Sequence, residues 1–170
     1  MGFPRHARPQ PAAGAATQAT GRSAASHEGR VAVSASNTRW RSDGFEFRCE
    51  DGARLLVTFV LECCDREAIG WVASPHGYSG ADIRDIMLKS VKKRLDQQLP
   101  ATPLQWLSDN SSTYTATMKR SYITHIPKPD RATALRNLAI AFEHYNEQHP
   151  HSALKYCSPR EFRRLAKAFT

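Results

Sequence analysis

Two aspartates stand where a carboxylate can bind a metal ion: Asp43, in an alternating apolar stretch, and Asp109, at the end of the short stretch 104–109. Asp43 shares a face with Phe45, where an unpaired carboxylate is costly unless it meets a cation or several hydrogen-bond donors. Converging carboxylates bind Mg²⁺ or Mn²⁺, which prefer oxygen ligands. Two such ions can activate an attacking oxygen and stabilise the leaving oxygen in phosphodiester exchange. The alternative is structural, with Asp109 and Asn110 in a strand-ending turn and Asp43 at a strand edge.

The first of these aspartates lies in the first of three predicted antiparallel strands. Side chains alternate between the two faces over residues 39–49, and a turn at 50–52 leads into a second strand over 54–64. That second stretch is apolar on nearly both faces, as a central strand is. A turn at 65–67 then precedes a third strand over 68–74. The pattern predicts a meander of three strands.

A helix and a fourth strand follow the meander. Ser79 is the expected N-cap, with Asp82 three residues later. Apolar residues then recur at helical spacing, and three lysines face outward: Ile83, Ile86, Met87, Val91 and Leu95, against Lys89, Lys92 and Lys93. Prolines at 100 and 103 break the helix, and residues 104–109 are a short strand reached by a crossover, hence parallel to an earlier one. The fold class is therefore α/β.

The C-terminal part is predicted to be helical. Asp130 caps a helix that ends near residues 146–150, with one apolar stripe made of Leu135, Leu138, Ala139, Phe142 and Tyr145. Ser158 and Glu161 form a capping box around Pro159 and begin a second helix, whose apolar residues are Phe162, Leu165, Ala166 and Phe169. Three regions follow from these patterns: a basic tail over 1–28, too poor in apolar residues to fold, a core over 29–150, and a basic helix over 151–170.

The charge is unevenly distributed along the chain. Residues 1–42, 43–116 and 117–170 carry net charges of +5, −3 and +6, which make up the total of +8. Basic flanks suit a phosphate backbone and an acidic centre suits a divalent cation, although charged runs are also ordinary solvated faces. The cations that we expect at a DNA backbone are Lys119, Arg120, Lys155, Arg160, Arg163 and Arg164.

The cysteines and the apolar runs bear on the compartment. Cys49, Cys63, Cys64 and Cys157 have no CxxC spacing, so neither a zinc ribbon nor a disulfide framework is indicated. No run approaches the ~18 apolar residues of a membrane span. We expect a soluble, cytoplasmic protein with no membrane partner.

Three blocks of the sequence resemble the integrase core of bacterial insertion-sequence transposases with an Asp-Asp-Glu (DDE) triad. They are WRSDGFEF at 40–47, WLSDNSSTYTA at 106–116, and AFEHYNEQHPHSALKYCSPREF at 141–162. The resemblance runs from Gly29 to Phe162 with one internal gap. It implies a ribonuclease H-like core, in which the first and fourth strands are neighbours, and assigns Asp43 and Asp109 as the first and second metal ligands.

The third ligand of that family is missing from this sequence. The family's catalytic glutamate lies on a helix roughly 35 residues after the second aspartate, whereas here the chain passes from Ala116 almost at once into a stretch resembling the sequence beyond that glutamate. A deletion near Ala116 and Thr117, removing the fifth strand and the glutamate-bearing helix, is the simplest explanation. Glu143 and Glu147 have a similar spacing from Asp109 but belong to a different block, so we assign no third carboxylate.

The histidines of the same block, His144, His149 and His151, could bind metal or DNA. Their place in a block that follows the catalytic helix favours surface contacts.

The resemblance implies Mg²⁺-dependent or Mn²⁺-dependent cleavage and joining of DNA strands. Because one of three ligands is absent, we predict a catalytically incomplete remnant with little or no activity. Two alternatives remain: a non-catalytic protein that binds DNA, a full-length transposase or itself, and a ribonuclease H-type metal nuclease with a rearranged third ligand.

Overall fold

The structure is a computed structural model that describes residues 33–96, 100, 102–108 and 113–168. The predicted tail over 1–28 and the predicted ligand Asp109 lie outside these residues.

Four strands form one mixed sheet. They are β1 (Arg39–Arg48), β2 (Arg54–Glu62), β3 (Ala68–Ser74) and β4 (Gln105–Ser108), and their spatial order is β3-β2-β1-β4. The first three pair antiparallel as a meander, and β4 pairs parallel to β1. This arrangement confirms the prediction of a mixed α/β, ribonuclease H-like sheet. It also makes β1 an inner strand that carries Asp43 beside the end of β4.

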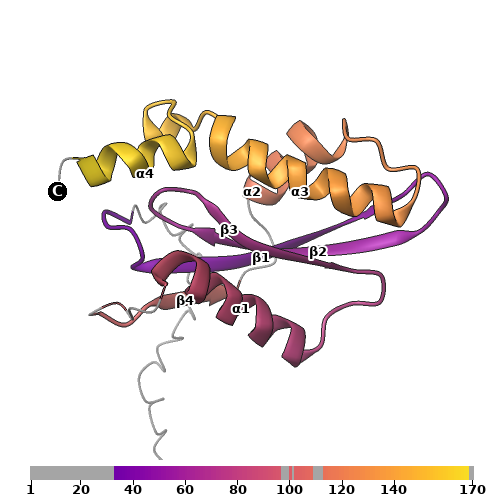
Figure 1. The fold of residues 1–170 in the computed structure, drawn as a ribbon, viewed down its shortest axis with the longest axis horizontal. Coiled ribbons are helices and arrows are strands. Elements are labelled where there is room, and N and C mark those ends of the chain that lie inside the picture. Colours follow the sequence, from indigo (N-terminus) through magenta and orange to yellow (C-terminus); the bar gives the residue numbers. More distant parts are fainter. Residues whose placement is uncertain (1–32, 97–99, 101, 109–112, 169–170) are drawn as a thin grey trace, which may run out of the picture. The chain divides into compact units, whose positions relative to one another are not determined.

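Helices cover both faces of the sheet, as Figure 1 shows. Helix α1 (Gly80–Leu95) lies on one face, and α2, α3 and α4 lie on the other. The helical segments of that second face are α2 (Thr113–Met118), the π-helical turn η1 (Lys119–Ile123), α3 (Arg131–Gln148), the 3₁₀ turn η2 (Ser152–Leu154) and α4 (Pro159–Ala168). The result is a three-layer α/β/α arrangement. No helix in the described part of the chain is long and apolar enough to cross a membrane.

The helix starts are those expected from the sequence. The Ser79 hydroxyl accepts from the Asp82 N–H while the Asp82 carboxylate accepts from the Ser79 N–H, a complete capping box. Ser158 and Glu161 exchange the same pair of bonds, each at 3.3 Å. Asp130 accepts from the backbone N–H of Thr133 at 2.8 Å. Each cap satisfies a backbone donor that the first helical turn leaves free.

Hydrophobic clusters fill the spaces between the layers on both faces of the sheet. Under α1, Trp40 and Ile86 are buried, and Trp40 meets Trp106 edge to face at 6.0 Å between ring centroids. Under α3, Phe59 packs on Phe142, which also stacks on Trp71 with centroids 5.5 Å apart. Burying such a ring contributes about 1.5 to 3 kcal/mol. The two clusters fix the orientation of β1.

The apolar faces of the last two helices differ from the prediction. In α3, Ala139 is exposed, and Ala134 and Ala141 are buried instead, because the buried face is rotated around the helix from the predicted stripe. In α4, Leu165 is 47% exposed, so the predicted stripe is not a core face. Ion pairs of Arg160, Arg163 and Arg164 join α4 to the rest of the molecule. Phe169 lies outside the described residues.

Candidate active site

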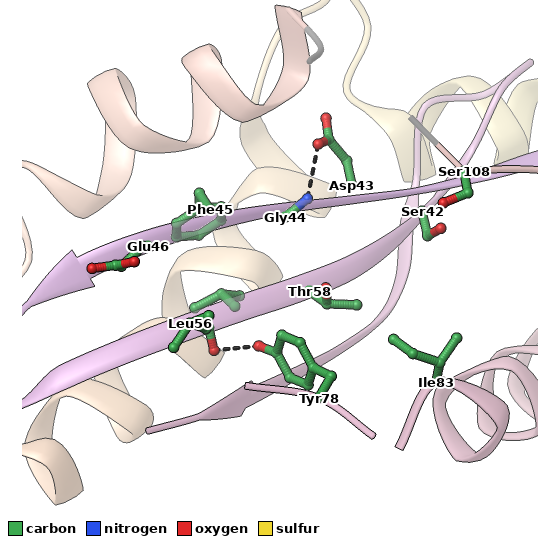
Figure 2. Close-up of a pocket in the computed structure, with 11 residues that line it drawn as sticks. Ser42, Asp43, Gly44, Phe45, Glu46, Leu56, Thr58, Tyr78, Ile83 and Ser108 are labelled. Atoms are coloured by element: carbon green, nitrogen blue, oxygen red, sulfur yellow. Dashed lines mark hydrogen bonds between the residues drawn. The ribbon is translucent and has the colours of Figure 1, made fainter. Parts of the chain in front are cut away.

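Asp43 lies in the middle of β1, and its side chain points to the face that α2 and α3 cover. The residue is only 4% exposed and shares that face with buried Phe45. Its Oδ1 accepts the backbone N–H of Gly44 at 2.8 Å, as Figure 2 shows. The strand alternation that suggested this position is therefore correct.

The parallel pairing of β1 with β4 brings together the residues that precede the two predicted ligands in the sequence. Ser42 lies directly opposite Ser108, and the Trp106 indole donates to the Ser42 hydroxyl at 3.3 Å. Ser42 is followed by Asp43 and Ser108 by Asp109. Each predicted ligand therefore comes one residue after a member of the same strand pair.

A groove of about 480 Å³ lies along β1, mainly on the side opposite the Asp43 carboxylate. Figure 2 shows small polar residues at its floor, among them Ser42, Thr58 and Ser108, with Tyr78 at its wall. Gly44 lies close to β2, because a Cβ there would lie 3.1 Å from the carbonyl oxygen of Val57. Sequence reasoning missed this groove, although the small residues between Trp40 and Phe45 are a signal for one.

Hydrogen bonds to β2 and β3 hold Tyr78 in the wall of the groove. Its hydroxyl donates to the carbonyl oxygens of Leu56 and, at 3.1 Å, of Val72. Burial raises the pKa of Tyr78 to about 12. The phenol therefore stays neutral and holds the segment before α1 on the sheet.

The described residues do not make a divalent-metal site by themselves. No group of three His, Cys, Asp or Glu side chains in the described ranges is placed to hold an ion. Asp43 is the one predicted ligand among them, and a hard cation needs several oxygen ligands. We therefore derive no catalytic step through a metal ion from this geometry.

A network of acids and arginines joins α4 and α1 to the turn between β2 and β3. Arg94 pairs with buried Asp65 and Glu67. The Glu67 carboxylate also forms ion pairs with Arg160 at 3.3 Å and with Arg163 at 2.8 Å. Its carboxylate is 4% exposed, so three cations meet at one buried group. Buried charges are tolerated when they are paired in this way.

The two glutamates considered as substitute ligands belong to the same network. Arg160 pairs with Glu143 and, at 2.7 Å, with Glu147, and Arg164 pairs with Glu147 at 3.2 Å. Their carboxylates are therefore occupied by arginines of α4. Three of the predicted DNA contacts, Arg160, Arg163 and Arg164, thus have carboxylate partners within the protein. The other three, Lys119, Arg120 and Lys155, are exposed.

Another acid, Glu62, is fully buried at the end of β2. It accepts backbone N–H groups of Asn37 at 3.0 Å, Cys64 at 2.8 Å and Asp65 at 2.6 Å. Burial, together with the charge of Asp65, raises the pKa of Glu62 to about 7. This residue organises the turn, and nothing in its sequence context distinguishes it from a surface glutamate.

Comparison with known proteins places this geometry in a family. A family model described as integrase core domain matches residues 113–159. The "Putative transposase InsD for insertion element IS2E" of Escherichia coli is 47% identical over 171 residues, which cover 81% of this chain and 78% of the relative. The "Transposase InsD for insertion element IS2A/D/F/H/I/K" of Escherichia coli has the same identity, and the alignment covers 57% of its length. The chain belongs to the insertion-element transposases with an integrase core domain.

This transposase chain spans little more than half of the second relative. The aligned length is 171 residues, whereas 81% of 170 residues is about 138, a difference of about 33. About 33 aligned positions of the relatives therefore have no counterpart in this chain.

Helix α2 begins shortly after the end of β4 in the sequence. Only positions 109–112 separate Ser108 from α2. Met118 at the end of α2, with Tyr122 and Ile123 of η1, then packs in the same buried cluster as Phe45. The sheet of the described residues accordingly ends at β4.

Two histidines of the family block, His144 and His149, contact Tyr122, and the third, His151, packs against His149. The Tyr122 hydroxyl lies 3.1 Å from Nδ1 of His149 and 3.4 Å from Nδ1 of His144. The rings of His149 and His151 meet edge to face at 4.9 Å. Burial and the charge of His144 lower the pKa of His149, which favours its neutral form. This aromatic packing joins α3 to η1 and to the segment after α3.

Proposed function

We propose that this chain is a DNA-binding integrase-core protein of an insertion element that retains the first two catalytic carboxylates and lacks the third. The observation that carries the proposal is the short path from β4 to α2. Only positions 109–112 separate the last residue of β4, Ser108, from the first residue of α2, Thr113. A fifth strand and a further helix do not fit in so few residues, since a strand alone usually takes about 5 to 6.

The retained pair rests on the parallel register of β1 and β4. Ser42 lies opposite Ser108, and Asp43 and Asp109 are the residues that follow these two serines in the sequence. Carboxylates from neighbouring strands can together bind the Mg²⁺ or Mn²⁺ ions used in phosphoryl transfer. We propose Asp43 and Asp109 as remnants of such a site.

Two observations support the loss of the third carboxylate. About 33 aligned positions of the relatives are absent from this chain, close to the length of the family segment that carries the glutamate. Glu143 and Glu147, the acids nearest to the family spacing, are bound by Arg160. Catalysis depends on holding ligands and reacting atoms in a defined geometry, so two carboxylates support little or no strand cleavage.

DNA is the proposed partner because the basic residues outnumber the acidic ones and the relatives are named as transposases. The net charge is +8, and charge of this sign attracts a phosphate backbone. A second copy of the chain or a full-length transposase is a further proposed partner, through the same core.

The test combines binding and cleavage by the purified chain. We expect labelled duplex DNA to bind in a salt-sensitive way, with an affinity that Asp43→Asn leaves unchanged, and no cleavage with Mn²⁺ present. Absence of binding at 50 mM salt would contradict the proposal. Metal-dependent cleavage that Asp43→Asn abolishes would instead favour a working nuclease whose third ligand comes from elsewhere in the chain.

A further inference from the structure

A pocket of about 350 Å³ lies between η1, the loop that follows it, and α3. Its volume is in the range of small-ligand pockets, about 300 to 1,000 Å³. η1 is a π-helical turn, a rare element that occurs frequently at functional sites. None of the described residues that line this η1–α3 pocket belongs to the sheet, so the pocket is separate from the groove along β1.

Hydrogen bonds hold the loop wall of the η1–α3 pocket against α3. The Lys128 ammonium donates to the carbonyl oxygens of Ile123 at 3.2 Å and of Ile126 at 3.4 Å, which fixes the course of the loop. The Asn137 amide of α3 donates to the carbonyl oxygen of Pro127 at 2.6 Å. A ligand therefore meets a pocket that is already formed, which lowers the entropy cost of binding.

Apolar side chains and flat rings both line the pocket. Ile126 and Ile140 supply aliphatic atoms, and Ile140 is 66% exposed. His125 and His144 add imidazole rings, and both residues are exposed. Histidine is among the side chains on which unstacked nucleic-acid bases stack. This lining therefore suits a flat aromatic ligand.

Hydrogen-bonding groups stand beside the apolar ones. The Ser121 hydroxyl can donate or accept, and the Asn137 side chain has a carbonyl oxygen besides the amide that is bonded to Pro127. The edge of a nucleobase carries both donors and acceptors. An aliphatic side chain of a protein partner would not use these groups, whereas a base can bond to them. The lining therefore favours a base over an aliphatic side chain.

Two arginines adjoin the lining of the pocket. Arg120 directly precedes Ser121 in η1, and Arg136 lies one helical turn before Ile140 on the same side of α3. Both arginines are exposed. No acid occurs among the described residues that line the pocket. Positive charge beside an aromatic-lined pocket suits a ligand that carries phosphate next to its ring.

Both arginines are available to a phosphate. Arg136 donates to the Thr133 hydroxyl at 3.0 Å rather than to a carboxylate, and Arg120 forms no ion pair with a described residue. The acids that flank this surface in the sequence have partners of their own. Asp130 caps α3, and Glu143 pairs with Arg160 of α4. A phosphate therefore does not have to displace a carboxylate here, as it would at the arginines of α4.

We propose that the η1–α3 pocket binds an unpaired base of a DNA strand. The rings of His125 and His144 stack beside the base, and the two exposed arginines that adjoin the pocket bind its phosphates. The bases of an intact duplex are paired and stacked, so only DNA with a gap, a nick or a frayed end offers such a base without a cost in unstacking. This inference rests on the proposed function and deepens it, since it names the form of DNA and a surface separate from the groove along β1.

The test compares two labelled DNAs of the same sequence and length, an intact duplex and a duplex with a short gap that exposes unpaired thymidines. The ratio of the two affinities is measured for the full chain and for four single variants. His125→Ala and Ile140→Ala alter the pocket. His76→Ala and Leu88→Ala are their matched controls, at exposed positions outside it. A ratio does not depend on the fraction of each preparation that is folded.

We expect the unmodified chain to bind the gapped DNA about fivefold or more tighter than the intact duplex, the size of effect that stacking of one base gives. His125→Ala and Ile140→Ala should each lose most of this preference. Their affinity for the intact duplex should stay unchanged, because neither variant removes a lysine or an arginine. The two control variants should keep the full preference.

The outcomes separate the pocket from the proposed function. Equal affinity for the two DNAs, or a preference that pocket and control variants keep or lose alike, overturns the pocket and leaves DNA binding in place. A pocket variant that loses self-association but keeps the preference also overturns it, since a segment of a second copy would then occupy the pocket. No binding of the unmodified chain to either DNA overturns both this inference and the proposed function.

Discussion

Ser42 and Ser108 lie directly opposite each other on the parallel strands β1 and β4, and each is followed in the sequence by one of two aspartates. The pairing is reinforced by the bond from the Trp106 indole to the Ser42 hydroxyl and by the contact of Trp106 with buried Trp40. Both tryptophans sit three residues before an aspartate, so the same W-x-x-D pattern that identifies the two blocks also aligns the two strands.

The first prediction concerns the buried ion pairs of α1. Arg94→Met leaves Asp65 and Glu67 short of a cation in the interior, so we expect the free energy of unfolding to fall by about 3 to 5 kcal/mol. Urea denaturation measures the change. Arg84→Met, at an exposed position of the same helix, is the matched control and should change it by less than about 0.5 kcal/mol. Equal effects of the two variants would contradict the assignment of Arg94 to the network.

The second prediction tests the close packing of α1 on β3. A Cβ at Gly70 would lie 2.7 Å from the Oγ of buried Ser90. Gly70→Ala should therefore lower the free energy of unfolding by about 1 to 3 kcal/mol. Ser90→Gly in the same chain removes the clash, so the double variant should lose less stability than the two single losses add up to. Strict additivity of the two losses would show that these residues do not touch.

The third prediction follows from the raised pKa of Glu62, about 7 in the folded chain. A carboxyl group whose pKa is higher in the folded than in the unfolded state adds stability that is present at low pH and lost as the pH rises. This loss runs from the ordinary pKa of a glutamate, 4.5, to the raised pKa of about 7. The unfolding free energy of the wild type relative to Glu62→Gln should fall across it, by a few kcal/mol at most.

Denaturant unfolding of both chains at several pH values between 4 and 8 provides that comparison. A difference that stays constant, or that grows as the pH rises, would mean that the three backbone N–H donors keep Glu62 ionised throughout.

Much of the fold could be predicted from local sequence signals. Ser79, Asp130 and Ser158 mark the helix starts because a capping side chain bonds to a backbone donor only two or three residues away. The strand around Asp43 follows from alternation alone. The prediction that Ala139 belongs to the buried face of α3 was wrong, because alanine is small enough to lie on a buried or on an exposed face of a helix. The packing of Phe142 and Leu138 decides which alanines are buried.

The site was less predictable because its interactions join distant parts of the chain. Arg160 meets Glu67 from 93 residues away, and Arg94 meets Asp65 from 29 residues away. Local charge balance cannot reveal such partners, so the α4 arginines were assigned to DNA on composition alone.

The most direct test of the proposed loss of catalysis restores the missing segment. The corresponding residues of an Escherichia coli relative are inserted between Ala116 and Thr117, and nicking and strand transfer on labelled DNA with Mn²⁺ are compared for the two chains. We predict activity in the restored chain only, and its loss on Asp43→Asn or Asp109→Asn. Activity in the unmodified chain that Asp109→Asn abolishes would contradict the account and show that another residue completes the site.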